Sequence, residues 1–150
     1  EYAGRGNPMA FRFPETSMPG LDFSFSGIKT AFMYFLRDEK AKNPAFVEQN
    51  LPDICASIQH TLVNMLLNRL RQASIQTGIN TIAIAGGVSA NTGLRKSLQS
   101  LGASLGWNIF IPAFQYCTDN AAMIAIAAHH KYLKRQFCTL DVVPLARMPL

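Results

Sequence analysis

The chain has 150 residues, enough for one domain with a hydrophobic core, and its 49% hydrophobic and 15% charged residues argue against a disordered protein. The net charge of +5 favours polyanions such as RNA or an anionic membrane, although the basic residues are scattered and, on charge alone, a solvated surface explains them best. No signal peptide is visible, and the apolar segments are too short or too amphipathic to span a bilayer, so no membrane partner is expected.

The three cysteines, Cys55, Cys117 and Cys138, show neither metal-ligand nor redox spacing. Their odd number and spacing indicate a reducing compartment, so we expect a cytoplasmic protein. Because the chain begins at Glu1 rather than at a methionine, we expect a fragment of a longer protein or a trimmed chain.

The first part of the chain leads from a loop into a helix. Residues 1–21 are rich in glycine, proline and arginine without periodicity, which predicts a loop-rich lead-in. Alternating aromatic and polar residues over 22–26 predict a half-buried strand. Apolar residues at helical spacing predict a helix over 28–42, which Asn43-Pro44 ends.

The remaining elements alternate between helices and strands. Residues 52–77 show the clearest helical pattern, with Pro52 in the first turn and Gly78 at the end. The order predicts a single domain of α/β class, whose core over 22–150 has a mostly parallel sheet flanked by helices. The other predicted elements are a buried parallel strand over 81–85, a helix over 91–101 that stops near Gly102, a strand over 107–111, a helix from Thr118 or Asp119 to Leu133, and an apolar tail over 140–145 that forms an edge strand or a coil.

The first candidate site is the segment 81–91, where a strand leads into two glycines and then into a helix. Gly86 and Gly87 let a ligand approach the backbone, and the helix N-terminus attracts anions, while Ser89 and Asn91 add hydrogen-bonding groups. A phosphate or an adenosine moiety suits such a turn. The alternative, which the segment alone favours, is an ordinary turn with Ser89 or Asn91 as the N-cap of the helix.

The second candidate site is the segment 117–123, which follows a strand and therefore lies near the carboxyl edge of the sheet. Asp119 is a candidate metal ligand. Taken alone, the segment favours the alternative that Asp119 caps the first turn of a helix. Cys117 also lies near this helix start, but no base partner for it is recognisable.

The third candidate site is the segment 22–30. Lys29 and nearby backbone amides could face a polyphosphate or an RNA backbone, although the Walker spacing is absent. The alternative is a structural junction that places Phe23 and Phe25 in the core, and the sequence supports the two about equally.

The three histidines show no metal-binding arrangement. His60 lies within a long predicted helix, and His129 and His130 are neighbours on the last helix, where adjacent side chains point about 100° apart. The zinc-protease motif His-Glu-x-x-His and the hydrolase motif Gly-x-Ser-x-Gly are both absent.

Together, the three candidate segments resemble the TsaD family. The resemblance rests on LDFSFSGIKTA at 21–31, IAGGVSANTGLR at 84–95 and CTDNAAMIA at 117–125, and it extends from Phe11 to the end of the chain. The family has the actin/Hsp70/sugar-kinase (ASKHA) fold of two related α/β lobes. This chain resembles most of the second, C-terminal lobe.

The resemblance implies an acyltransferase of tRNA processing. TsaD proteins move threonylcarbamoyl from threonylcarbamoyl-AMP to N6 of adenosine 37 in tRNAs that read ANN codons, which forms t6A. Asn91, with Gly86 and Gly87, matches the adenylate-binding motif of the family, and Asp119 matches an aspartate that ligates iron or zinc. Two histidines of a first-lobe His-x-x-x-His motif complete that metal, and no histidine of this chain matches them. We therefore expect the chain alone to be inactive and not to hold the metal.

The resemblance also implies partners, namely the tRNA anticodon loop and, in bacteria, TsaB-like and TsaE-like proteins. Other interpretations stay open. One is a non-catalytic lobe that binds nucleotide or self-associates, and another is a metal-dependent glycoprotease, the older label of the family. A phosphotransferase of the same superfold would need phosphate loops from both lobes, so it ranks lower. For the segment Ser26–Thr30 the resemblance implies no residue-level role.

Overall fold

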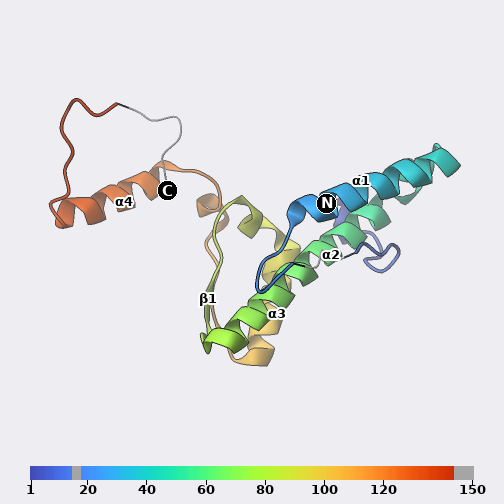
Figure 1. The fold of residues 1–150 in the computed structure, drawn as a ribbon, viewed down its shortest axis with the longest axis horizontal. Coiled ribbons are helices and arrows are strands. Elements are labelled where there is room, and N and C mark those ends of the chain that lie inside the picture. Colours follow the sequence, from blue (N-terminus) through green and yellow to red (C-terminus); the bar gives the residue numbers. More distant parts are fainter. Residues whose placement is uncertain (15–17, 144–150) are drawn as a thin grey trace.

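The computed structural model describes residues 1–14 and 18–143, which form several helices and a small two-stranded sheet (Figure 1). The α/β class predicted from the sequence is confirmed. In chain order the elements are η1 (Tyr2–Gly4), α1 (Phe25–Lys42), α2 (Phe46–Thr77), β1 (Thr81–Ala83), η2 (Gly87–Ala90), α3 (Thr92–Leu105), β2 (Asn108–Phe110), η3 (Phe114–Tyr116) and α4 (Ala121–Leu133).

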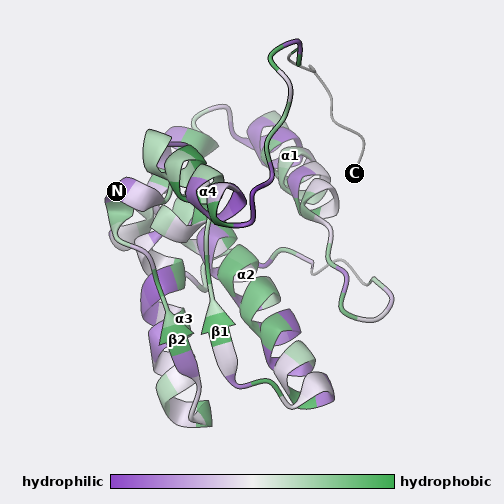
Figure 2. Ribbon diagram, turned by 90° about the vertical axis from the view of Figure 1, so that its left-hand side faces the viewer, coloured by the Kyte–Doolittle hydropathy of each residue, from purple (hydrophilic) through white to green (hydrophobic). Residues whose placement is uncertain are grey.

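The sheet of the described residues consists of β1 and β2, which run parallel with Ile82 opposite Ile109. The connection between them contains α3, because parallel strands cannot be joined by a tight hairpin. Figure 2 shows α2 and α3 on the same side of the two strands. The buried cluster between these helices and the sheet consists of Val63, Leu67, Ile82, Leu94 and Leu98.

Among the described residues, helices cover only one face of the sheet, which corrects the expectation of a buried strand over 81–85. Ile82 is buried, whereas Thr81 and Ala83 on either side of it are exposed. In β2, Phe110 is 55% exposed. Alternate residues of a strand point to opposite faces, so the outer face of the sheet carries no helix in the described part of the chain.

Aromatic side chains hold the lead-in segment against the helices. Phe13 is buried and packs edge-on against Phe32 and Phe35 of α1, with ring centroids 5.4 and 5.2 Å apart. Phe11 lies 5.3 Å from Phe35 and 5.6 Å from Phe46 at the start of α2. Aromatic pairs in these orientations stabilise beyond the area that they bury. Residues 11–13 of the lead-in are therefore packed as part of the body.

The helix α1 begins three residues before its predicted start, and the strand predicted over 22–26 is wrong. The hydroxyl of Ser24 accepts a hydrogen bond of 3.1 Å from the N–H of Gly27, which caps the helix at Phe25. Phe23 and Phe25 pack on each other and are 39% and 47% exposed, so they are not core residues. The capping hydrogen bond of Ser24 favours a helix start here over the strand that the short alternating pattern predicted.

The helix α2 also begins before its predicted start. It runs from Phe46, so Pro52 lies inside the helix instead of in its first turn. An internal proline costs about 3 kcal/mol because it removes a backbone hydrogen bond and crowds the preceding turn. The packing of Phe46 against Phe11 and Phe35 lies in the added turns and offsets that cost. Gly78, with φ of +71°, ends the helix as predicted.

The helix α3 continues beyond Gly102, where the sequence predicted its end. Gly102 is buried inside the helix, and a Cβ there would collide with the side chain of Ile109 in β2. This glycine therefore allows the helix to lie close to the strand. The helix ends at Leu105, and the next residue, Gly106, takes the left-handed conformation with φ of +68°.

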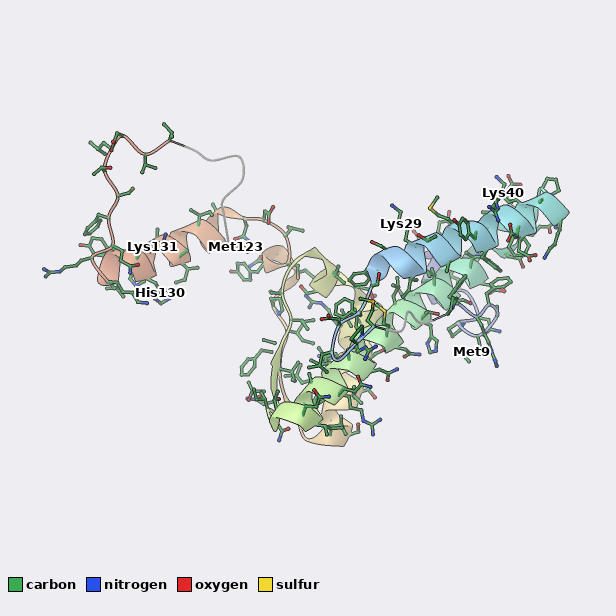
Figure 3. All side chains as sticks on the ribbon, viewed as in Figure 1. Met9, Lys29, Lys40, Met123, His130 and Lys131 are labelled. Atoms are coloured by element: carbon green, nitrogen blue, oxygen red, sulfur yellow. The ribbon has the colours of Figure 1, made fainter. Side chains whose placement is uncertain are left out.

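The helix α4 begins at Ala121, later than the predicted start at Thr118 or Asp119. Asn120 caps it, because its side-chain oxygen accepts a hydrogen bond of 3.2 Å from the N–H of Met123. All residues of α4 are exposed, and Figure 3 shows Met123 and its helix apart from the body formed by α1, α2 and α3. Of the predicted tail, residues 140–143 form no strand, and residues 144–145 lie outside the described residues.

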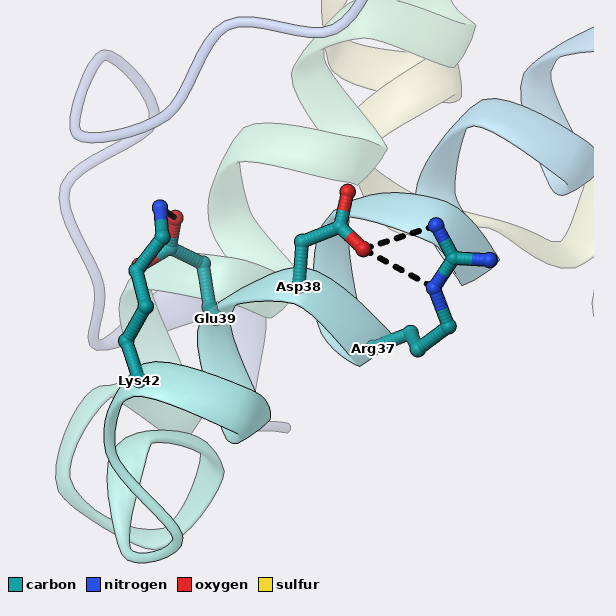
Figure 4. Close-up of polar contacts among 4 residues, drawn as sticks. All are labelled: Arg37, Asp38, Glu39 and Lys42. Atoms are coloured by element: carbon teal, nitrogen blue, oxygen red, sulfur yellow. Dashed lines mark hydrogen bonds and ion pairs between the residues drawn. The ribbon is translucent and has the colours of Figure 1, made fainter.

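The exposed face of α1 carries short-range ion pairs (Figure 4). Arg37 pairs with Asp38 at 2.8 Å, and Lys42 pairs with Glu39 at 2.7 Å. The hydrogen bond from Lys42 to Glu39, together with the charge of Glu39, raises the pKa of Lys42. These pairs are solvated and contribute little to stability.

The described residues contain no helix that is both long and apolar enough to cross a membrane. The three cysteines are free thiols, with Cys117 buried and Cys138 exposed.

Leu98 is fully buried at the centre of the core, whereas Leu105 on the same helix is 39% exposed. We expect Leu98→Ala to lower the free energy of unfolding by about 2–5 kcal/mol, because it removes buried methyl groups and leaves a cavity. Leu105→Ala, the matched control, should cost much less. Urea unfolding followed by circular dichroism measures both, and equal losses would contradict this placement of the core.

Candidate functional site

The turn at Gly86-Gly87 follows β1 and presents open backbone. Gly86 has φ of +81° and ψ of 175°, a region that only glycine occupies readily. The N–H and the hydroxyl of Ser89 both donate to the carbonyl oxygen of Gly86, at 3.0 and 2.6 Å. Apart from the adjoining residues, no atom of the described chain lies within 4 Å of the position that a Cβ would take at either glycine. A ligand can therefore lie directly against this backbone.

Asn91 connects the turn to two helices. Its side-chain oxygen accepts a hydrogen bond of 2.9 Å from the N–H of Leu94, so Asn91 is the N-cap of α3. Its Nδ2 donates to Oε1 of Gln59 on α2 at 3.1 Å. A side-chain amide carries two N–H groups, so one donor of Asn91 remains for a ligand. The capping role expected as the alternative is confirmed, and it leaves a binding role possible.

A groove of about 250 Å³ opens beside Asn91. It is mostly apolar, and the amides of Gln59 and Asn91 supply polar groups at its wall. Ligand sites usually combine an apolar lining with a few fixed polar groups, an environment that suits a planar base. The groove is lined by Phe25, Ile58, Gln59, Leu62, Val63, Leu66, Val88, Asn91 and Leu94.

Arg95 links the glycine turn to the segment that follows β2. Its Nε donates to the carbonyl oxygen of Ser89 at 2.6 Å. Its Nη2 donates to the carbonyl oxygen of Pro112 at 2.7 Å and to Sγ of Cys117 at 3.0 Å. The guanidinium also lies 4.0 Å from the ring centroid of Phe114. The first and second candidate segments are thus brought together through one side chain.

Asp119 is exposed and lies just outside α4. Because Asn120 takes the capping position, the expectation that Asp119 caps the helix is wrong. Within residues 1–14 and 18–143, no hydrogen bond or ion pair engages the Asp119 carboxylate. An exposed carboxylate without a partner suits one position in a metal coordination shell. No group of three histidine, cysteine or acidic side chains in the described ranges could hold a metal ion, so these residues do not form a complete three-ligand site by themselves.

The third candidate segment contributes an aromatic ring and not its lysine. Phe25 lines the groove beside Asn91, which brings this segment to the first one. Lys29 is exposed on α1 (Figure 3). The hydroxyl of Thr30 donates to the carbonyl oxygen of Ser26 at 3.0 Å within the helix. In the described structure no contact joins Lys29 to the glycine turn.

The histidines stay outside the site. His60 bonds through Nε2 to the side chain of Asn64 one turn away on α2, at 2.8 Å. His129 and His130 lie on the exposed α4 with ring centroids 5.8 Å apart.

Two residues of the site were missed by sequence reasoning. Arg95 ends the IAGGVSANTGLR motif but was counted among the scattered surface charges, and its position in the first turn of α3 was the available signal. Gln59 lies on α2, far from the motifs in sequence. It stands with His60 and Thr61 in a polar run between Ile58 and Leu62, so no local signal in the sequence marks it as a partner of Asn91.

Comparisons with known proteins agree with the motifs. A family model described as "TsaD: tRNA N6-adenosine threonylcarbamoyltransferase" matches residues 1–126. A tRNA N6-adenosine threonylcarbamoyltransferase of Cytophaga hutchinsonii is 56% identical over 98% of this chain and 43% of its own length. Proteins of the same name from Porphyromonas gingivalis and Geotalea daltonii are 51% and 38% identical, each over 99% of this chain and 43% of the relative. The chain therefore spans less than half the length of these relatives.

The two glycines of the turn should respond differently to alanine. Gly86→Ala should destabilise the chain by about 1–3 kcal/mol, because its backbone conformation is strained for any residue with a Cβ. Gly87→Ala should change stability little, since its φ is ordinary and a Cβ would meet open space. Thermal unfolding of both variants measures the difference. A Gly86→Ala variant as stable as Gly87→Ala would contradict the geometry of the turn.

Proposed function

This chain belongs to the TsaD family of tRNA N6-adenosine threonylcarbamoyltransferases, and we propose that it supplies the C-terminal part of such an enzyme. The full-length protein would move threonylcarbamoyl from threonylcarbamoyl-AMP to N6 of adenosine 37 in tRNA, the reaction that forms t6A. The observation that carries this proposal is the match of the family model over residues 1–126. The open glycine turn lies within that range.

The adenylate would bind at the Gly86–Asn91 turn. The turn offers backbone that no side chain covers, and the free N–H of the Asn91 amide can donate to the nucleotide. The adjacent groove, with Phe25 and Leu94 in its lining, suits the adenine ring. The apolar groove would hold the base of the adenosine moiety, and the open backbone beside it would bind the polar part of the same moiety.

Asp119 would provide one ligand of an iron or zinc ion. Its carboxylate is exposed and free of partners in the described chain, and oxygen donors of this kind bind divalent cations. The remaining ligands would come from outside this chain, because the described residues offer no group of three. When bound, such an ion supplies Lewis-acid polarisation of substrate oxygens. We therefore propose that the chain alone neither retains the metal nor catalyses transfer.

We propose that the chain is one lobe of an ASKHA fold, with residues 1–21 as a lead-in to an α/β core over 22–150. The parallel pairing of β1 and β2, with helices on one face, supports this assignment. The exposed outer face of the sheet and the exposed α4 are the surfaces that the rest of the full-length protein would cover.

The partners follow from the same family assignment. The anticodon loop of tRNA would be the acceptor, since unstacked loop bases are the parts of RNA that proteins usually reach. The net charge of +5 would help to attract its backbone. TsaB-like and TsaE-like proteins would be partners of the full-length protein, in the cytoplasm.

A second candidate function is a non-catalytic lobe that associates with its own kind. The exposed apolar side chains of α4 favour it, among them Ile124 at 74% and Ile126 at 55% exposure. Large apolar patches on a surface usually mark interaction sites. Saturable adenylate binding that depends on Asn91 would argue against this function.

Asn91→Asp separates binding from capping. The carboxylate keeps the acceptor that caps α3, and the Gln59 amide can turn so that its Nε2 donates to the carboxylate in place of the lost Asn91 donor, so stability should be largely retained. In the full-length enzyme we expect the KM for threonylcarbamoyl-AMP to rise about tenfold or more, since a binding hydrogen bond is lost and a negative charge faces the nucleotide. Asn68→Asp, on the exposed side of α2, is the control. Formation of t6A in transcribed tRNA, measured by mass spectrometry, gives the KM. An unchanged KM would remove Asn91 from the adenylate site, and a wild-type enzyme that forms no t6A would refute the function.

Asp119→Ala should reduce the metal bound by the full-length protein. Loss of one of few protein ligands should lower metal affinity about tenfold or more. Asp38→Ala is the matched control, because Asp38 is an exposed carboxylate on α1 that pairs only with its neighbour Arg37. Elemental analysis after dialysis measures the metal content. Equal metal in Asp119→Ala and the wild type would exclude Asp119 as a ligand.

A further inference from the structure

The two strands separate at the point where Arg95 bridges them. The last backbone hydrogen bond between them runs from the N–H of Ile84 to the carbonyl oxygen of Phe110, at 3.1 Å. Beyond this bond, the segment that follows β1 enters the glycine turn, and the segment that follows β2 continues through Pro112. Arg95 then donates to a carbonyl oxygen on each side, those of Ser89 and Pro112. The Arg95 guanidinium therefore joins the two segments beyond the last hydrogen bond of the sheet.

Arg95 is suited to hold this connection rigidly. It lies in the first turn of α3, which Asn91 caps, so its backbone is fixed to the glycine turn. Its planar head donates in fixed directions to Ser89 and Pro112, and the ring of Phe114 stacks on its face. A lysine at this position could reach one or two acceptors but could not reproduce the fork or the stacking.

The contact with Cys117 extends the link toward Asp119. Sγ of Cys117 accepts a hydrogen bond of 3.0 Å from Arg95, and the thiol donates to the carbonyl oxygen of Ala113 at 3.5 Å. Cys117 is 2% exposed although the residues that follow it are exposed. Arg95 thus fixes the last buried residue before Asp119. Among the described residues, no other side chain bonds to both the 84–91 and the 112–117 segments.

We propose that Arg95 is a positioning residue that locks the 112–117 segment, and with it Asp119, onto the adenylate-binding turn. The inference rests on the proposed function for its catalytic meaning, while the mechanical link stands on the contacts alone. In the full-length enzyme the lock sets the location of the Asp119 carboxylate relative to the bound adenylate. Its loss should therefore slow the reaction without preventing adenylate from binding.

Two variants and a matched control test the lock in the full-length protein. Arg95→Met keeps an apolar stem but no donors, and Arg95→Lys keeps the charge without the fork. The control is Arg69→Met, because Arg69 on α2 also donates to loop carbonyl oxygens, those of Gly20 at 2.8 Å and Met18 at 3.4 Å. Any general cost of removing a loop-pinning arginine should appear in the control as well.

The first measurement is amide hydrogen exchange without ligand. The N–H groups of Tyr116 and Cys117 are hydrogen-bonded within the turn, so their exchange reports opening of this segment. We expect exchange there to be about tenfold faster or more in Arg95→Met, intermediate in Arg95→Lys, and unchanged in Arg69→Met. Unchanged exchange in Arg95→Met, or equal acceleration in Arg69→Met, would overturn the lock. If Arg95→Met does not fold, exchange in Arg95→Lys is compared with exchange in Arg69→Met. Unchanged exchange in Arg95→Lys, or equal acceleration in both variants, would then overturn the lock.

The second measurement is the kinetics of t6A formation. Arg95→Met should lower kcat about 10- to 100-fold while the KM for threonylcarbamoyl-AMP stays within about threefold, because the hydrogen bonds from Ser89 to Gly86 and the Asn91 cap still hold the adenylate turn after the bond from Arg95 is lost. Partial recovery of kcat in Arg95→Lys supports the lock, and a rise in KM with unchanged kcat overturns the positioning role. If the wild type forms no t6A, the proposed function fails, and the exchange experiment still decides whether Arg95 makes the link.

Discussion

The packing of both flanks of α2 is the constraint on which the rest of the described structure depends. One flank receives η1, α1 and the aromatic lead-in, and the other receives α3 and the sheet. A helix of 32 residues is long enough to serve both layers. Because α2 spans them, Gln59 can reach Asn91 from one layer while Phe25 of α1 reaches the same groove from the other. The candidate site therefore exists only where the two layers meet.

Within that frame, the chemistry gathers where the parallel strands end. The carboxyl ends of parallel strands lie at one edge of a sheet, and the segments that leave them are free to bind ligands. Here the glycine turn leaves β1, and the segment with Cys117 and Asp119 leaves β2. Asn91 is shared between helix capping and the groove, and Arg95 is shared between the two segments. Stability and the candidate function thus depend on the same few side chains.

The sequence predicted the fold class, the parallel strands and every long helix, because apolar spacing carries that information locally. Errors arose where a tertiary contact changed the local choice. Phe46 extends α2 beyond Pro52 by packing on Phe11, and Gly102 lies inside α3 because Ile109 needs the space. The starts of α1 and α4 differ from the predicted ones because Ser24 and Asn120 cap these helices. Such capping residues are a local signal that the sequence did contain. The sequence could not predict the hydrogen-bond partners of Asn91 and Arg95, because Gln59 and Cys117 lie 32 and 22 residues away from them in the chain.

We propose that adenylate lies on the Gly86–Asn91 turn, with its base in the groove beside Gln59. The most direct test is a crystal structure of the full-length protein with bound AMP. We expect AMP density against the backbone of Gly86 and Gly87, a hydrogen bond from the free N–H of Asn91 to the nucleotide, and the adenine ring near Phe25. Density for AMP at another place, with the turn empty, would contradict the account.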